Sequence, residues 1–136
     1  MPLTAKQSEQ MLRAAIAKAE EIGVAVHIAV LDAGAHLKAF LRMDGAVLGS
    51  LDIALKKAKT AVLFEANSEA VWEYVKPGAP APGLELTNGM LVTFAGGIPI
   101  KSSAGHILGA IGVSGGAVSE DFEVASAGSA ALRFDT

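Results

Sequence analysis

The sequence has no cysteine and no concentrated run of basic residues. Without cysteine there is no disulfide framework, no thiol nucleophile and no cysteine-ligated metal. Lysine and arginine number 11 against 14 aspartate and glutamate residues, which gives a formal net charge of −3. Nucleic-acid binding normally needs a dense positive surface, so we expect no nucleic-acid partner.

Long apolar runs are also missing. No stretch approaches the ~20 apolar residues that a membrane-spanning helix needs, so we expect no membrane partner. The opening segment "MPLTAKQSEQ" is polar and has no apolar core of the kind found in a signal peptide. These two observations predict a cytoplasmic protein.

What the chain does have is a large share of apolar and small residues. Hydrophobic residues make up 51% of its 136 residues, and there are 15 glycines. This length predicts one domain, residues 1–136. The segments "GGIPI", "GAIGVSGG" and "VASAGSAAL" are almost uncharged, and we expect them to bury apolar surface between subunits of a homo-oligomer. The alternative is that their small residues allow close packing inside one subunit.

The periodicity of apolar residues predicts helices and strands in a definite order. Helical spacing follows a Thr4–Gln7 capping box and ends near Gly23. A hairpin follows, and then an irregular, proline-rich segment separates two helices from three short strands, "MLVTFA", "IPIK" and "HILGAIGVS". A final helix starts at Ser119. The hairpin is predicted over 24–43, and the two helices over 47–64 and 68–74. This pattern predicts an α+β domain with one mostly antiparallel, five-stranded sheet flanked by helices.

The three histidines do not have the spacing of a dedicated zinc site. His27 lies within an apolar strand and is expected in the core. His36 stands beside a turn, on the same strand face as Phe40 and Arg42, where a functional and a solvated role remain open. His106 is expected at the edge of a turn.

The segment "GVSGG" fits the pattern G-x-S-x-G of serine hydrolases. Because no histidine follows Ser114, we do not expect a serine hydrolase. Glycines before a helix N-terminus nevertheless expose backbone amides that can hold a carboxylate or a phosphate.

Charged and apolar residues also gather around the turn at 42–44. Arg42 and Lys57 could both face an anionic ligand, with Phe40 and Met43 as apolar walls. Lysines on a helix more often form a solvated face, and spacing alone does not decide between the two interpretations.

Five segments in order resemble the GlcG/HbpS family of haem-degrading-like domains, which is related to the C-terminal domain of PduO-type proteins. They are "VLDAGAHLKAFLRMDGA", "IALKKAKTA", "GGIPI", "GAIGVSGG" and "EDFEVASAG". The resemblance covers residues 24–132. It implies a profilin-like α/β sandwich, frequent homo-oligomers, and haem or corrinoid binding in some members. Members often sit among catabolic enzymes, so the resemblance also implies an accessory protein of catabolism.

From this resemblance we predict a cytoplasmic, oligomeric protein that binds haem or a similar anionic tetrapyrrole without a covalent bond. His36 is the candidate iron ligand, because neutral imidazole suits iron. Arg42 and Lys57 are the candidate partners of the haem propionates. Phe40 and Met43 complete the predicted cofactor-binding set.

Two other functions remain open. The first is a small enzyme, such as an isomerase, lyase or hydratase, that acts on an organic acid of a catabolic pathway by proton transfer. Its acid–base groups would come from His36, Asp44, Lys57 and Glu120, and Arg42 would hold the substrate carboxylate. The second is a scaffolding oligomer without a ligand.

Overall fold

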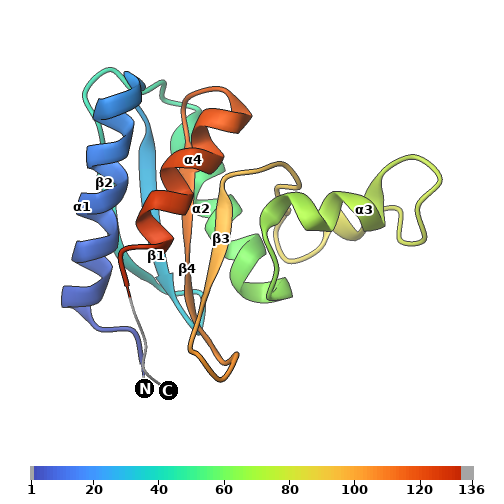
Figure 1. Cartoon of the computed structure of the whole chain (residues 1–136). Coiled ribbons are helices and arrows are strands. Elements are labelled where there is room, and N and C mark those ends of the chain that lie inside the picture. Colours follow the sequence, from blue (N-terminus) through green and yellow to red (C-terminus); the bar gives the residue numbers. More distant parts are fainter. Residues whose placement is uncertain (1, 133–136) are drawn as a thin grey trace.

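A computed structural model describes residues 2–132 of the chain (Figure 1). Four strands form one antiparallel sheet in the order β2-β1-β4-β3. The elements along the chain are α1 (Ala5–Ile22), β1 (His27–Asp32), β2 (Leu37–Arg42), α2 (Ser50–Phe64), the 3₁₀ helix η1 (Ser68–Val71), α3 (Trp72–Val75), the 3₁₀ helix η2 (Leu84–Leu86), β3 (Gly97–Lys101), β4 (Ile107–Ser114) and α4 (Val118–Ser129). The predicted α+β class with a sheet flanked by helices is confirmed.

The first helix has the ends that the sequence predicts. The Thr4 hydroxyl accepts the Gln7 amide at 3.0 Å, and the Gln7 side chain accepts the Thr4 amide at 2.9 Å. Gly23 ends the helix in the left-handed conformation, with φ of 75°. Both ends therefore satisfy backbone groups that a helix would otherwise leave without partners.

Helices cover the two faces of the sheet (Figure 1). Helices α1 and α4 pack against each other and on one face, where Met11, Ile28, Ile111 and Val124 are fully buried. Helix α2 packs on the opposite face through small residues such as Ala58. This three-layer arrangement buries β1 and β4, the central strands, on both sides.

The prediction of a fifth strand at "MLVTFA" is wrong. Met90 has a positive φ of 81°, and the segment after it forms no ladder with a strand. The Val92 amide is instead bonded to the Thr60 hydroxyl of α2 at 3.1 Å, and the Leu91 amide to the Glu85 carbonyl at 2.8 Å. Because a side chain of α2 and a carbonyl of η2 accept these amides, the segment lies on α2 and does not extend the sheet.

Residues 66–92, which we call the arm, project from the body of the molecule beyond β3 (Figure 1). Within the arm, α3 contacts the two 3₁₀ helices, and η1 also contacts α2 and β3. Several large apolar side chains of the arm are exposed: Trp72, Tyr74, Leu86 and Met90.

The glycines of β4 are used inside the subunit. A side chain at Gly112 would collide with the Ala54 carbonyl and with Ala58 of α2, and one at Gly109 would collide with the Leu31 carbonyl. These glycines therefore allow close packing inside one subunit, which was the alternative to a contact between subunits.

We expect Gly112→Ala to destabilise the protein by about 1–3 kcal/mol, because the added methyl group must push α2 away from the sheet. Gly49→Ala is the matched control, since no atom lies within 4 Å of the added carbon and φ is ordinary. Urea unfolding followed by circular dichroism measures both. Equal stability of the two variants would contradict the close approach of α2 and β4.

Candidate functional site

Among the described residues, Lys57 is the largest one whose side chain is completely buried. It projects from α2 toward the end of β4 that leads into α4. Its ammonium group donates to the Asp121 carboxylate of α4 at 2.9 Å and to the Val113 carbonyl of β4 at 2.8 Å. One side chain thus connects both faces of the sheet with the central strand.

The surroundings of this ion pair are built to hold it. The other Asp121 oxygen accepts the Gly116 amide at 2.9 Å. The Lys57 ammonium also lies 5.1 Å from the centre of the Phe94 ring, within the range of a cation–π contact. At Gly96 a side chain would strike both the ammonium nitrogen and the Val113 carbonyl, so only glycine leaves room for the lysine.

Burial opposes both charges of the pair. It lowers the pKa of Lys57 and raises the pKa of Asp121. The hydrogen bond and the charge attraction between the two groups act against both shifts. Since the ammonium already has three partners and no contact with solvent, it is not open to a carboxylate ligand in this conformation.

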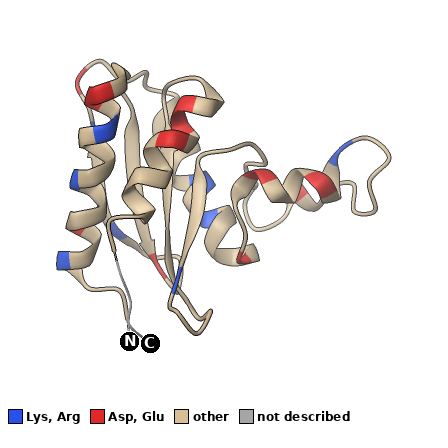
Figure 2. Ribbon diagram, in the orientation of Figure 1, with Lys and Arg blue, Asp and Glu red and all other residues tan. Residues whose placement is uncertain are grey.

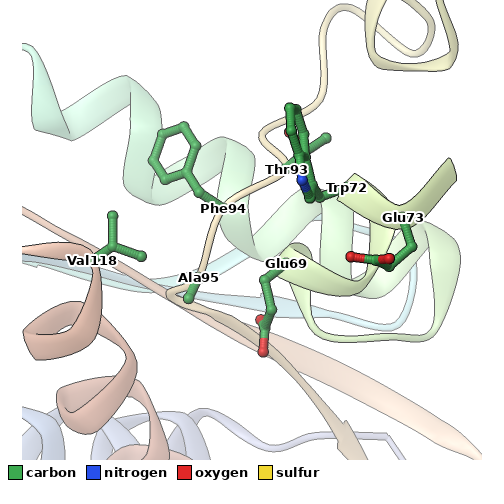
Figure 3. Close-up of a pocket in the computed structure, with 7 residues that line it drawn as sticks. All are labelled: Glu69, Trp72, Glu73, Thr93, Phe94, Ala95 and Val118. Carbon is green, nitrogen blue, oxygen red and sulfur yellow. The ribbon is translucent and has the colours of Figure 1, made fainter. Parts of the chain in front are cut away.

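A cavity of about 500 Å³ lies on the outer side of Phe94 (Figure 3). We call it the Trp72 pocket. Its wall comes from the arm, the segment that leads into β3, and the start of α4. The lining residues are Glu69, Trp72, Glu73, Thr93, Phe94, Ala95 and Val118.

Hydrogen bonds of one buried serine fix the wall of this pocket. The Ser68 hydroxyl of η1 donates to the Phe94 carbonyl at 2.7 Å and accepts the Gly97 amide at 2.9 Å. Ser68 therefore joins the base of the arm to the segment that carries Phe94, and the aromatic wall is held before any ligand arrives.

The predicted iron ligand His36 lies at the other end of the sheet. Its ring is exposed, with 81% of the side chain accessible, and its Nδ1 lies 3.4 Å from the Asp32 carboxylate. Asp32 accepts the amides of Gly34 and His36 at 2.9 Å each, and the His36 amide is the largest cause of its lowered pKa. Ile28 pairs with Val113, whose carbonyl accepts the Lys57 ammonium. Asp32 lies four residues farther along β1, so it is separated from this position by about 13 Å along the strand.

The structure does not bring the other predicted ligand residues together with Lys57. Arg42, Met43 and Asp44 border a shallow pocket beside Ile16 and Glu20 of α1. Arg42 ends β2 and borders that pocket beside α1, whereas Lys57 comes from α2 and is completely buried. The predicted pairing of Arg42 and Lys57 around one anion is therefore absent from this arrangement, and the role of each residue stays a prediction.

Phe40 and Glu120 also have local roles. The Phe40 ring packs against the ring of His27 with centroids 5.8 Å apart. The Glu120 carboxylate accepts the Ala117 amide at 2.8 Å at the start of α4. The four candidate acid–base groups, His36, Asp44, Lys57 and Glu120, do not line a common pocket among those found in the described structure.

His27 is buried, as its apolar strand predicts. Its Nε2 lies 2.9 Å from the Val47 carbonyl, which requires that nitrogen to carry the proton. Its Nδ1 is buried without a hydrogen-bond partner. Within residues 2–132 no three His, Cys, Asp or Glu side chains are grouped closely enough to hold a metal ion.

Sequence reasoning missed Asp121, Phe94, Glu69 and Trp72. Asp121 follows the chosen Glu120 directly, and only the orientation of α4 shows which carboxylate meets Lys57. Glu69, Trp72 and Glu73 stand at i, i+3 and i+4, a spacing that places side chains on one helix face and could have indicated a shared surface.

Comparison with known proteins gives the family. A model of the family described as haem degrading protein HbpS-like matches residues 3–130. The chain therefore belongs to the HbpS-like family, which confirms the resemblance to GlcG/HbpS proteins. In the described residues no helix has both the length and the apolar character needed to cross a membrane.

Individual relatives are similar over most of the chain. An uncharacterized 15.0 kDa protein from the dhaT-dhaS intergenic region of Citrobacter freundii is 41% identical over 120 residues, which are 88% of this chain and 84% of the relative. The corrinoid adenosyltransferase PduO of Citrobacter freundii is 38% identical over all of this chain but over only 41% of PduO. The chain thus spans about two fifths of that enzyme.

A solved structure of a PduOC:Heme complex has the same fold. It is 34% identical, has a TM-score of 0.92, and covers 97% of this chain and 96% of that chain.

We expect Lys57→Met to destabilise the protein by about 3–5 kcal/mol, because it leaves the Asp121 carboxylate buried without its counter-ion. The double variant Lys57→Met/Asp121→Leu should lose less than the sum of the two single variants, since it leaves no lone charge. Urea unfolding of the four proteins measures this coupling.

The neighbouring Lys56→Met is the matched control. Lys56 also pairs with an aspartate, Asp52, at 3.1 Å, but this pair is in contact with solvent, since 30% of the Lys56 side chain and 67% of the Asp52 side chain are accessible. Its loss should change stability by less than about 1 kcal/mol. If Lys57→Met were no more destabilising than Lys56→Met, the buried pair would not stabilise the fold as described.

Proposed function

We propose that this protein binds haem without a covalent bond. The main support is the PduOC:Heme complex, whose fold matches 97% of this chain at a TM-score of 0.92. Membership of the HbpS-like family agrees with the proposal. Since a shared fold does not by itself fix a function, the residues of this chain have to fit the cofactor as well.

His36 is the residue that would hold the haem iron. Its Nδ1 faces the Asp32 carboxylate at 3.4 Å, which orients the ring and leaves Nε2 directed away from that contact. Carboxylates commonly hold metal-ligating histidines in this way. A porphyrin would bring its own nitrogen ligands, so His36 alone could hold the iron and a cluster of three protein ligands would not be required.

The surface beside His36 also suits a flat apolar cofactor. A hollow of about 330 Å³ next to the ring includes Pro2, Leu3, Ile107 and Leu108. Lys101 ends β3 opposite Ile107 and is exposed, and we assign its ammonium to a propionate. When bound, haem would supply an iron centre there, and the chain would hold and orient it.

Addition of haemin at a 1:1 ratio should shift the Soret band and saturate at one haem per chain. Loss of the imidazole in His36→Ala should weaken haemin binding by at least about tenfold. Absorption titration measures both. His106→Ala is the matched control, because His106 is an exposed histidine on the β3–β4 turn, and this variant should bind as the unaltered protein does.

An unchanged Soret band at stoichiometric haemin would refute haem binding. A normal titration of His36→Ala together with a weakened His106→Ala would move the ligand to His106.

We further propose that the protein forms a homo-oligomer through the arm. The large exposed side chains Tyr74, Leu86 and Met90 lie on the arm, and Leu86 is 64% exposed. Next to them, a groove of about 520 Å³ between the end of α2 and the arm is lined mainly by apolar residues such as Phe64, Val71 and Leu84. A second copy of the chain would remove this surface from water.

Light scattering after size-exclusion chromatography should give a mass of at least two chains. Leu86→Glu should lower that mass, because it places a charge in the proposed contact. Leu37→Glu, an exposed leucine of the edge strand β2, should leave it unchanged. A single-chain mass for the unaltered protein at micromolar concentration would exclude a stable oligomer.

A further inference from the structure

The Trp72 pocket is negatively charged, unlike the site that a haem propionate needs. Glu69 and Glu73 both line it, and no lysine or arginine does. The arm as a whole has three acidic residues, Glu69, Glu73 and Glu85, against the single basic residue Lys76, and Figure 2 shows this acidic character.

Glu69 is the charged group of the pocket that lacks a counter-ion among the described residues. Its Oε2 accepts a long hydrogen bond of 3.3 Å from the Asn67 amide, and its Oε1 is buried with no hydrogen-bond partner. Glu73 differs, because the Lys76 ammonium lies 2.6 Å from its carboxylate. The buried Oε1 is closed to a ligand in this conformation, but no described residue neutralises the charge of the carboxylate. A cation bound in the pocket would therefore gain a favourable interaction with that charge.

Two aromatic rings form part of the wall of this pocket. Figure 3 shows Phe94 and Trp72 on either side of the opening, Glu73 on the side of Trp72, and the Glu69 side chain below them with its carboxylate directed away from both rings. Phe94 is 43% and Trp72 46% exposed, so both offer ring surface to a ligand. Aromatic faces attract ammonium groups, and Lys57 already uses one such contact on Phe94.

The size and stability of the pocket suit a small molecule. Its volume of about 500 Å³ lies within the usual range for small ligands. The bonds of Ser68 hold the Phe94 segment, and the ion pair of Lys57 lies directly behind the ring. The site is therefore formed in advance.

We propose that the Trp72 pocket binds a small organic cation, a molecule with an apolar body and an amine or quaternary ammonium group. The ammonium group lies on the acidic side of the pocket, where the charge of Glu69 attracts it, and the apolar body lies between Trp72, Phe94 and Val118. Haem, whose propionates are anionic, is unsuited to this pocket, so the site is independent of the haem proposal.

Trp72 is the only tryptophan of the chain, so its fluorescence reports on the pocket. Benzyltrimethylammonium should change this fluorescence with a saturable curve. Benzyl alcohol, which has the ring without the charge, should bind at least about fivefold more weakly, as the loss of a cation–π contact and an ion pair predicts.

Glu69→Gln removes the charge and keeps the shape of the side chain. It should weaken the binding of benzyltrimethylammonium by at least about fivefold while leaving benzyl alcohol unaffected. Glu85→Gln is the matched control, because Glu85 also has a buried oxygen without a partner but does not line this pocket. Its binding curve should equal that of the unaltered protein, and circular dichroism confirms that both variants fold.

Three results would overturn the proposal: no saturable change in fluorescence, equal affinity for the charged and the neutral probe, or unaltered binding in Glu69→Gln. Light scattering with and without benzyltrimethylammonium tests whether a second copy of the chain occupies the pocket. A mass that falls when the probe is added would show that a cationic group of a second copy occupies the pocket, in place of a free small molecule. Neither result affects the haemin titration, so the two proposals fail independently.

Discussion

The buried ion pair between Lys57 and Asp121 is the interaction on which the rest of the structure depends. It joins α2 on one face of the sheet to α4 on the other, and the Val113 carbonyl adds the central strand β4. A charge without contact with water is stable only when its partners are in place, so α2, α4 and the β3 entrance at Gly96 have to assemble together. Phe94 is then fixed over the ammonium group and forms one wall of the Trp72 pocket.

The two ends of the sheet carry different kinds of side chain. The end with the Asp32–His36 pair presents an exposed imidazole that a carboxylate orients. The opposite end closes over Lys57 and carries the acidic, aromatic Trp72 pocket on its outer side. An anionic ligand is opposed by the second surface, because the charge of Glu69 lacks a counter-ion among the described residues.

Membership of the HbpS-like family accounts for the sheet and the helices that cover it, but function depends on side chains at particular places. The arm illustrates this point. It contacts the body at its two ends, through Ser68 and through the Val92–Thr60 bond, and between them it contains the short helices α3 and η2. Exposed apolar residues such as Leu86 are therefore available for contacts that the body of the fold does not determine.

The sequence by itself determined the features that depend on near neighbours in the chain. The capping box at Thr4, the hairpin before Arg42 and the class of the fold follow from local propensity and the alternation of apolar residues. Only the tertiary structure decided that Lys57 is buried and that its partner is Asp121, 64 residues away, and not Glu120. It also decided that 90–95 lies on α2, because Thr60 takes an amide that a strand would have used. These outcomes depend on which distant groups meet in three dimensions, and spacing along one chain carries no information about that.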